Sequence, residues 1–469
     1  IVFNGEVYNF KEIKKELLEL GYAFHSDSDT EVILKSYHQW GIKAVDRFNG
    51  MFAITIYDKK FNKLIFIRDR AGVKPFYYYK KDSLILFSSE LKSFHKHPNF
   101  QKEINKSSLC LYLQFGYIPE PHSIFKNCYK LRAGHYVEID LKSQNFKEIK
   151  YWDVVDFYNK PKLDISQNEA IERTEELLKS SFEYRMVSDV PVGVFLSGGY
   201  DSSVVTAILQ SGRSEKLNTF TIGFKEKGFD EAPYAKEVAK YLGTNHTEYY
   251  CTQKDALEII PKLCELYDEP FGDSSAIPTT LVSALARKYV TVSLSADGGD
   301  EIFAGYSKYT TTMQYFNKFN SVPKSIKSLI SLGMDRINPK YIPILNKTYN
   351  FATRYEKINA ILKAKNSVEA MKYTSEYFTK KERDKLLKLG FDDLVTNFDI
   401  KVADTNDEIN QMLAIDYKTY MVDDILTKVD RATMSVSLEG REPLLDYRLI
   451  EFVSQLPSNL KYKDGDKKW

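Results

Sequence analysis

The fold of this chain is decided by residues 190–202, Val-Pro-Val-Gly-Val-Phe-Leu-Ser-Gly-Gly-Tyr-Asp-Ser. The apolar run at 190–196 is typical of a buried strand, and the apolar spacing at 202–210 is typical of a helix. Two glycines between them let the backbone approach a bound group, and the free N–H groups at a helix start attract anions. The two serines add hydroxyl donors. The stretch therefore predicts a loop that binds phosphate groups.

Asp201 is the unusual member of this loop. A carboxylate beside bound phosphates is explained if it binds Mg²⁺, because hard cations prefer oxygen ligands. No Lys follows the glycines, so the loop is not of the GxxxxGK[ST] type. The alternative is a plain glycine turn that caps a helix, but the complete hexapeptide between strand and helix favours phosphate binding.

A second acidic loop, Ser295-Ala-Asp-Gly-Gly-Asp-Glu301, follows a β-rich run at 289–294. Its carboxylates repel one another unless a cation lies between them, and a solvated acidic turn is the alternative. β-rich runs at 217–224 and 247–251 and a helical pattern at 232–242 alternate along this region, as in a parallel sheet with helices on both faces. Both loops are then expected at carboxyl ends of strands, where such sheets bind ligands.

Residues 1–150 show a different pattern, with short β-rich runs at 51–57, 63–67 and 83–88 and a helical pattern at 11–20. Strands joined by short turns indicate stacked antiparallel sheets. The sequence therefore predicts an α+β part followed by an α/β part.

The polar segment at 159–164 is expected to be a linker, and the capping-box spacing at 166–169 predicts a helix start. We expect two domains, residues 1–155 and 166–469. Residues 310–425 are expected to be mostly helical, and they contain no chemical motif.

Composition argues against several classes of protein. Of 469 residues, 66 are basic and 64 acidic, and the net charge of +2 gives no electrostatic footprint for nucleic acid or an anionic membrane. No apolar run is long enough to span a bilayer. The four cysteines form no CxxC pair, which is typical of a cytoplasmic protein.

With these motifs the chain resembles the glutamine-dependent asparagine synthetase family over nearly its whole length. The segments that carry the resemblance are 3–9, 28–33, 68–75 and 89–92 in the first part, and 197–203, 295–306, 423–434 and 438–446 in the second. Ala296 departs from the family, which usually has Gly there. The resemblance implies an N-terminal-nucleophile hydrolase sandwich followed by a PP-loop ATP pyrophosphatase domain with a helical C-terminal part.

The resemblance implies a carbon–nitrogen ligase that uses ATP and Mg²⁺ to convert L-aspartate and L-glutamine to L-asparagine and L-glutamate. The glutaminase releases ammonia, and the synthetase makes a β-aspartyl-adenylate and diphosphate, so the partners are small molecules. A homodimer is a further expectation.

The resemblance also implies roles for individual residues. Asn4 and Gly5 would form an oxyanion hole, and Glu6 and Asp29 would bind the amino group of glutamine. The ATP-binding set would be Leu196 and Ile222 at the adenine, Ser197, Gly198, Gly199 and Ser202 at the pyrophosphate, Ser295 and Ala296 at the nucleotide, and Asp201 and Asp300 at Mg²⁺.

Asp297 matches the acidic position linked to adenylate formation. Lys428 and Arg431 would form an electrostatic clamp near the phosphates, and a helix surface pair is their alternative. For Glu439 and Arg441 a structural salt bridge is at least as plausible as catalysis.

Two departures from the family matter. The family nucleophile is an N-terminal Cys, whereas this chain begins at Ile1 and has no Cys before Cys110. We therefore expect a fragment, cut at both ends, that uses ammonia and not glutamine. In the acceptor region, some members carry paired Thr and an Arg, whereas this chain has Ser274 and Ser275 without the Arg.

The acceptor is thus expected to be aspartate or another carboxylate such as a sugar uronate in polysaccharide biosynthesis. Other PP-loop enzymes, a β-lactam-forming relative and an inactive fragment are the remaining alternatives. The glutaminase motif at 4–6 and the loop around Asp297 argue against the other PP-loop enzymes.

Overall fold

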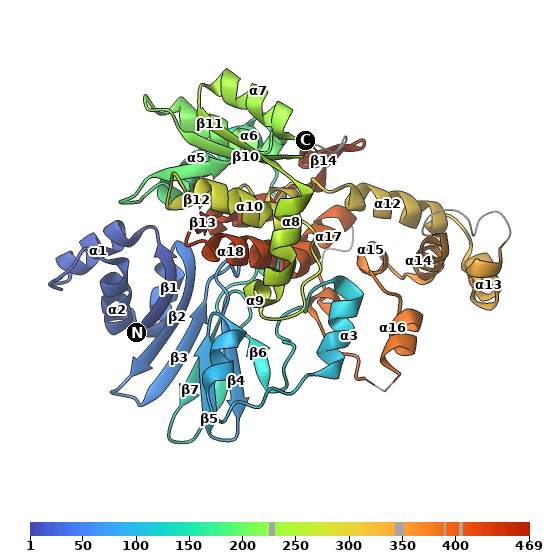
Figure 1. Cartoon of the computed structure of the whole chain (residues 1–469), viewed down its shortest axis with the longest axis horizontal. Coiled ribbons are helices and arrows are strands. Elements are labelled where there is room, and N and C mark those ends of the chain that lie inside the picture. The colour runs from blue at the N-terminus through green and yellow to red at the C-terminus, as the bar shows by residue number, and fades with distance from the viewer. Residues whose placement is uncertain (225–229, 343–350, 389–390, 403–406) are drawn as a thin grey trace.

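The computed structural model describes residues 1–224, 230–342, 351–388, 391–402 and 407–469. An antiparallel β-sandwich forms the N-terminal part, a parallel sheet flanked by helices forms the middle of the chain, and a helical arm extends to one side (Figure 1). Both predicted sheet types are therefore confirmed.

The first sheet of the sandwich has five antiparallel strands in the order β1-β2-β3-β7-β8. The strands are β1 (Val2–Val7), β2 (Gly50–Asp58), β3 (Lys63–Arg68), β7 (His135–Asp140) and β8 (Phe146–Lys150). Helices α1 (Phe10–Glu19) and α2 (Asp29–Trp40) cover one face, where Ile13, Leu17, Val32 and Ile33 pack against strand residues.

The second sheet lies against the other face and has the order β5-β4-β6. Its strands are β5 (Leu84–Ser88), β4 (Tyr77–Lys81) and β6 (Cys128–Lys130). Between the sheets, the ring of Phe66 lies 5.0 Å from that of Phe76 and 5.2 Å from that of Phe87. Helix α3 (Lys106–Phe115) packs on the outer face of this sheet, so the layers run helix, sheet, sheet, helix.

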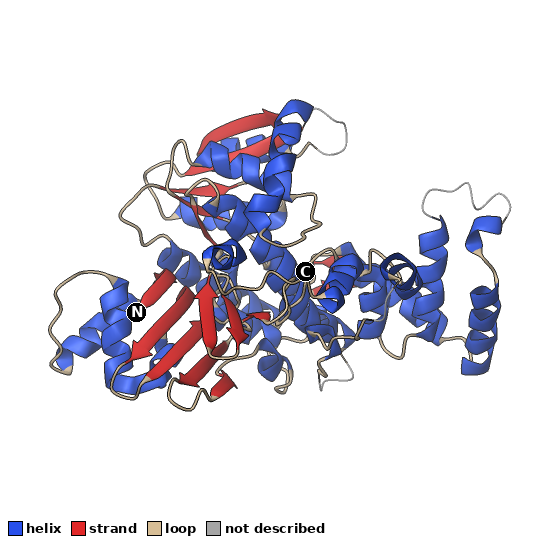
Figure 2. Cartoon of the chain, turned by 60° about the horizontal axis from the view of Figure 1, so that its bottom comes forward, coloured by secondary structure: helices blue, strands red, loops and turns tan. Residues whose placement is uncertain are grey.

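The second part of the chain is built on a five-stranded parallel sheet in the order β11-β10-β9-β12-β13. Figure 2 shows strands and helices packed together throughout the chain. The strands are β9 (Val192–Phe195), β10 (Asn218–Phe224), β11 (Asn245–Cys251), β12 (Val292–Leu294) and β13 (Glu439–Arg441). Strand β13 was not predicted, because three residues with charged ends carry no alternating apolar pattern.

Helices cover both faces of the parallel sheet. On one face Val205 and Leu209 of α6 (Tyr200–Ser211) join the core around Val194, and on the other Leu285 of α10 (Ala276–Ala286) packs on Phe220. Other helices of this part are α5 (Gln167–Arg185), α7 (Ala232–Leu242), α8 (Gln253–Ile259), α9 (Leu263–Tyr267), α11 (Gly299–Ile302), α18 (Thr427–Met434) and α19 (Tyr447–Ser454).

The predicted linker is a loop between α4 (Val154–Tyr158) and α5, and the hydroxyl of Ser166 caps α5 by accepting from the N–H of Glu169 at 3.2 Å. The largely helical character predicted for 310–425 is confirmed for its described residues. They form α12 (Ser307–Asn320), α13 (Lys324–Arg336), α14 (Phe351–Lys363), α15 (Ser367–Ser375), α16 (Lys380–Leu387), α17 (Glu408–Asp416) and the π-helix Tyr417–Leu426.

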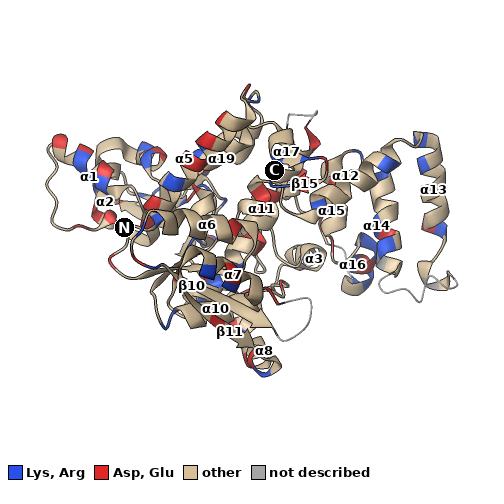
Figure 3. Cartoon of the chain, turned by 90° about the horizontal axis from the view of Figure 1, so that it is seen from above, with Lys and Arg blue, Asp and Glu red and all other residues tan. Residues whose placement is uncertain are grey.

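Basic and acidic residues are interspersed along the described parts of the chain (Figure 3), and the net charge is small, at +2. None of the helices in the described segments combines the length and apolar character that crossing a bilayer requires.

Buried ion pairs hold the sandwich against the parallel-sheet part. Asp446 accepts from Arg185 at 3.0 Å and from the side-chain amide of Asn49, on the sandwich, at 2.9 Å. Lys74 of the sandwich pairs with Asp430 of α18 at 3.1 Å. Although burial would raise the pKa of Asp446, Arg185 and Arg448 hold that pKa below its usual range.

We predict that Asp446→Asn lowers the free energy of unfolding by about 3–5 kcal/mol, because it leaves Arg185 buried without its carboxylate. The stabilisation is present above the unfolded pKa of Asp and is lost as pH falls through the lower folded pKa. Urea unfolding at pH 7 measures the change. Glu175→Gln, in an exposed helical pair with Lys179, is the control and should cost less than about 0.5 kcal/mol; equal effects would contradict the prediction.

Candidate functional site

The predicted phosphate loop joins β9 to α6. Gly198 has a φ of +80°, and a Cβ on it would lie 2.6 Å from the backbone nitrogen of Ala235, so the turn requires glycine. The hydroxyls of Ser197 and Ser202 lie 3.0 Å apart across the turn. Gly199 occupies the N-cap of α6 and brings no side-chain oxygen. The N–H groups at the start of α6 and the two hydroxyls therefore lie at one place, where they could bind a phosphate.

The acidic loop lies beside it. Ser295 follows β12 and donates its N–H to the carbonyl of Arg441 at 2.9 Å, while its hydroxyl donates to Asp297. A Cβ on Gly299 would lie 2.5 Å from the Oδ2 of Asp201. The two loops, almost a hundred positions apart in sequence, are thus in contact, as parallel pairing of β9 with β12 predicts.

One ammonium group joins the two carboxylates predicted to bind metal. Lys468 Nζ lies 2.6 Å from Asp201 Oδ2 and 2.7 Å from Asp300 Oδ1. Burial raises the pKa of Asp201, and Lys468 opposes this rise. For Lys468, burial would lower the pKa, but the two carboxylates outweigh it and raise that pKa. The position between the carboxylates is therefore one that favours positive charge.

This geometry fits a Mg²⁺ ion. Mg²⁺ is commonly bound by one or two carboxylates together with substrate phosphates and water, and the two carboxylates already share one cationic group. Among the described residues no group of three or more His, Cys, Asp and Glu forms a complete metal cage, so phosphate oxygens would complete the coordination. Sequence reasoning missed Lys468, because a lysine in the polar stretch at 461–468 carries no local signal.

The residues predicted at the adenine line the same edge of the sheet. Leu196 is fully buried against Ala235 and Ala239 of α7. Ile222, near the carboxyl end of β10, is half-buried, as is Ala296 in the acidic loop. These three positions therefore lie at the edge of the sheet that carries the predicted phosphate loop.

Lys428 of α18 reaches the predicted acceptor region. Its Nζ lies 2.9 Å from Ser275 Oγ and 3.1 Å from Asp273. Burial would lower the pKa of Lys428, but Asp297, Asp273 and Asp424 outweigh it and raise that pKa. Ser274 is exposed. Lys428 is therefore a buried cation between the acidic loop and the acceptor region, and not part of a helix surface pair.

Arg431 lies elsewhere. It is buried, pairs with Glu90 at 3.0 Å and donates to the carbonyl of Ser89 at 2.7 Å, and it lies 3.5 Å from Asp268. The structure brings Arg431 to the contact between the two parts of the chain and not to the nucleotide loops.

Arg441 forms a structural salt bridge with Glu439 at 2.6 Å. Its guanidinium also donates to the carbonyls of Arg185 and Val187, at 2.8 and 2.7 Å. These contacts orient β13 beneath the acidic loop, which agrees with the structural alternative.

The predicted glutamine residues lie together on β1 and α2. Gly5 has a φ of +136°, and a Cβ on it would overlap the carbonyl of Met51. The side-chain amide of Asn4 donates to Ser89 Oγ at 3.0 Å. Strand β1 therefore presents an amide and an open glycine backbone next to each other.

Two carboxylates flank this strand. Asp29 accepts from the N–H of Val7 at 3.0 Å, and its charge acts on Glu6. Burial, followed by the charge of Glu439, raises the pKa of Glu6 to about 7. Arg441 and Lys74 lower the pKa of Glu6 but do not outweigh these effects. Two neighbouring acids of this kind suit a positively charged amino group.

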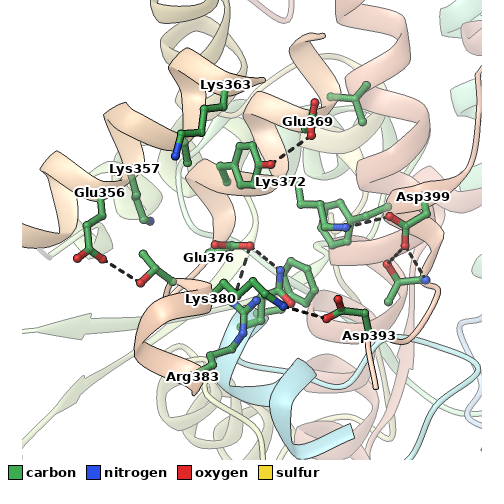
Figure 4. Close-up of a pocket in the computed structure, with 18 of the residues that line it drawn as sticks. Glu356, Lys357, Lys363, Glu369, Lys372, Glu376, Lys380, Arg383, Asp393 and Asp399 are labelled. Atoms are coloured by element: carbon green, nitrogen blue, oxygen red, sulfur yellow. Dashed lines mark hydrogen bonds and ion pairs between the residues drawn. The ribbon is translucent and has the colours of Figure 1, made fainter. Parts of the chain in front are cut away.

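A further cavity lies outside this site, in the helical arm (Figure 4). It has a volume of about 1380 Å³ and is lined by residues of α3, α14, α15 and α16. Its charged residues largely pair with one another, in the pairs Lys363–Asp335, Lys372–Asp399, Lys380–Asp393 and Arg383–Glu376. The lining therefore favours no single sign of ligand charge.

Comparison with known proteins finds two matching families. The asparagine synthase family matches residues 173–469, and the glutamine amidotransferase domain family matches residues 1–152. The chain is 38% identical to a putative glutamine-hydrolysing asparagine synthetase 2 of Methanocaldococcus jannaschii, over 86% of this chain and 80% of that protein. It is 32% identical to the glutamine-hydrolysing asparagine synthetase 1 of Bacillus subtilis, over 100% of this chain and 72% of that protein.

We predict that Lys468→Gln raises the affinity of the nucleotide-free chain for Mg²⁺ by about tenfold, or ~1.4 kcal/mol, because Mg²⁺ no longer displaces an ammonium. Isothermal titration calorimetry with MgCl₂ measures the affinity. Lys467→Gln is the matched control, since Lys467 is exposed and bonds only to Ser307 among the described residues. Unchanged or weaker Mg²⁺ binding by Lys468→Gln would contradict the prediction.

Proposed function

Because this chain belongs to the asparagine synthase family of glutamine-hydrolysing carbon–nitrogen ligases, we propose that it converts L-aspartate to L-asparagine through a β-aspartyl-adenylate. In this proposal residues 1–155 bind glutamine, and residues 166–469 consume ATP and release AMP and diphosphate. This chain has no Cys before Cys110, so it takes its nitrogen from added ammonia. The free state of the described cysteines agrees with a cytoplasmic location.

One observation carries the proposal: the phosphate loop and the acidic loop meet so that Asp201 and Asp300 share one cation. The triphosphate of ATP would be bound here by three features that lie together: a helix start, two hydroxyls and a cation site. A loop beside them with a further carboxylate, Asp297, suits a reaction at the α-phosphorus.

We assign the chemistry to the residues as follows. Ser197, Ser202 and the N–H groups of Gly198 and Gly199 hold the β- and γ-phosphates, which leave as diphosphate. The acceptor carboxylate attacks the α-phosphorus and the bond to the β-phosphate breaks. Bound Mg²⁺ would supply positive charge to the phosphate oxygens.

Lys428 is placed to stabilise negative charge on the acceptor side of the α-phosphate, since it bonds to Ser275 and is influenced by Asp297. Ammonia then attacks the acyl carbon of the adenylate, loses a proton, and AMP leaves. In the sandwich, Asn4 and Gly5 would bind the oxyanion, and Glu6 and Asp29 would bind the glutamine amino group.

A second candidate exists for the carboxylate substrate that accepts the nitrogen. Lys428 is the only cation whose bond to Asp273 or Ser275 the structure records among the described residues, and residues 268–278 contain no Arg, whereas some family members carry one in this region. An acceptor without an α-carboxylate, such as a sugar uronate, would not need that Arg.

We predict diphosphate release when the chain is given ATP, Mg²⁺, ammonium chloride and L-aspartate, and none above background with galacturonate or glucuronate. Asp201→Asn and Asp300→Asn should each lower kcat/KM by about 100-fold, because a carboxylate is lost from the site of charge development. A coupled diphosphate assay measures both. Glu175→Gln is the control, and release with a uronate alone would overturn the aspartate assignment.

We also predict that glutamine binding strengthens about tenfold between pH 6 and pH 8. Glu6, with a pKa of about 7, is then converted from a neutral acid to a carboxylate that attracts the glutamine ammonium. Calorimetry at several pH values measures this. Glu6→Gln should remove the pH dependence, and a pH dependence retained in that variant would assign it to another group.

A further inference from the structure

The buried π-helix at 417–426 connects α17 to α18 and lies between the two parts of the chain. All of its residues except Tyr420 are buried. π-helical segments are rare in proteins, and they occur frequently at functional sites. Three acids belong to this region: Asp416, which ends α17, and Asp423 and Asp424 within the π-helix.

Two of the three acids have structural partners. Asp416 pairs with Lys308 at 2.6 Å and accepts from the hydroxyl of Tyr309. Asp423 pairs with Lys130 at 3.2 Å and accepts from the N–H of Glu120 at 2.9 Å. Both carboxylates therefore have contacts that explain their burial.

Asp424 does not. It is 7% exposed, and its Oδ1 is buried without a hydrogen-bond partner among the described residues. Burial, followed by the charge of Asp273, raises the pKa of Asp424 to about 8, while Lys428 opposes the rise. A buried carboxylate oxygen without a donor is costly, so this position is one at which a bound group with N–H donors would be stabilised.

The surroundings of Asp424 indicate what kind of group this is. Its charge acts on the hydroxyls of Tyr117, Tyr267, Tyr377 and Tyr420. The rings of Tyr117 and Tyr420 are 6.4 Å apart. Aromatic rings around a carboxylate favour an ammonium, which interacts with ring faces and with the negative oxygen together.

The cations of the protein near Asp424 already have other partners. Lys428 bonds to Ser275 and Asp273, and Lys308 bonds to Asp416. Their charges moderate the pKa of Asp424, but neither ammonium donates to it. An ammonium that donates to Asp424 would therefore come from a bound ligand.

Asp424 also lies on the acceptor side of the adenylation loops. The charges of Asp297, Asp273 and Asp424 act together on the single ammonium of Lys428. An acceptor whose reacting carboxylate is bound by Lys428 would therefore lie beside Asp424 as well. Aspartate carries an ammonium, whereas a sugar uronate has none.

We propose that Asp424 binds the ammonium group of an amino-acid acceptor and so selects amino acids over carboxylates that lack an amino group. This inference rests on the proposed function, because it names the acceptor class of the same adenylation site. Asp424 is then a specificity-determining residue.

The test compares L-aspartate with succinate, which differs only by lacking the amino group. Diphosphate release by wild type and Asp424→Asn is measured with ATP, Mg²⁺ and ammonium chloride. Wild type should prefer aspartate in kcat/KM, and Asp424→Asn should lose about 10- to 100-fold with aspartate, through KM, while succinate changes little. Asp335→Asn, at a half-exposed helical position paired with Lys363, is the matched control.

The outcomes separate the inference from the proposed function. No diphosphate from wild type with aspartate would refute the proposed function itself. Activity of wild type with unchanged aspartate kinetics in Asp424→Asn would overturn the inference alone. A raised KM for ammonium with an unchanged KM for aspartate would assign Asp424 to the nitrogen donor and would also overturn it.

A direct measurement keeps the test valid if Asp424→Asn fails to fold. Calorimetry on the wild-type chain with an ATP analogue that resists cleavage between the α- and β-phosphates compares binding of L-aspartate and succinate. Tighter binding of aspartate, weakening as pH falls below about 8 and Asp424 becomes neutral, is expected. Equal affinity for the two acids would overturn the inference.

Discussion

The carboxylate of Asp201 and the backbone of Gly299 are in contact, and the candidate active site depends on this contact. A Cβ at position 299 would lie 2.5 Å from Oδ2, so a larger residue there would force the carboxylate of Asp201 to move. Parallel pairing of β9 with β12 brings the two loops to one edge of the sheet. With the loops in contact, Asp201 and Asp300 are close enough to share the ammonium of Lys468. The repulsion between two carboxylates is thereby converted into a site for positive charge.

A second level of organisation is the set of buried ion pairs between the sandwich and the parallel-sheet part. Lys74 with Asp430, Lys130 with Asp423, and Arg431 with Glu90 all cross this boundary. Breaking a buried pair leaves an uncompensated charge, so the relative position of the two parts is strongly specified. That position matters for the proposed chemistry, in which ammonia would reach an adenylate formed beside the parallel sheet. The same boundary contains Asp424, whose Oδ1 has no hydrogen-bond partner among the described residues, in contrast to the paired acids beside it.

Much of the site could be predicted from local sequence. Gly198 and Gly299 lie where the backbone closely approaches another segment. The acids next to them follow strands that the sequence shows as apolar runs. Lys468 could not be predicted, since its role arises from a contact with Asp201, some 267 positions away in sequence. The position of Arg431 could not be predicted either. A cation in a helical motif gives no information on whether it faces phosphate or a carboxylate of another domain. Strand β13 is too short and too polar for a pattern, and it exists because β12 offers it backbone partners.

The sequence by itself determined the two sheet types, the two nucleotide loops and the family, because each depends on local backbone requirements and on the order of strands and helices. Only the tertiary structure decided which charges are satisfied. Pairing depends on distances between side chains from distant segments, and no local pattern encodes those distances. The stretch at 190–202 thus predicted a phosphate site without its neighbours. The folded chain supplied the cation that joins Asp201 to Asp300, the buried Lys428 at the acceptor region and the unpartnered acid behind it.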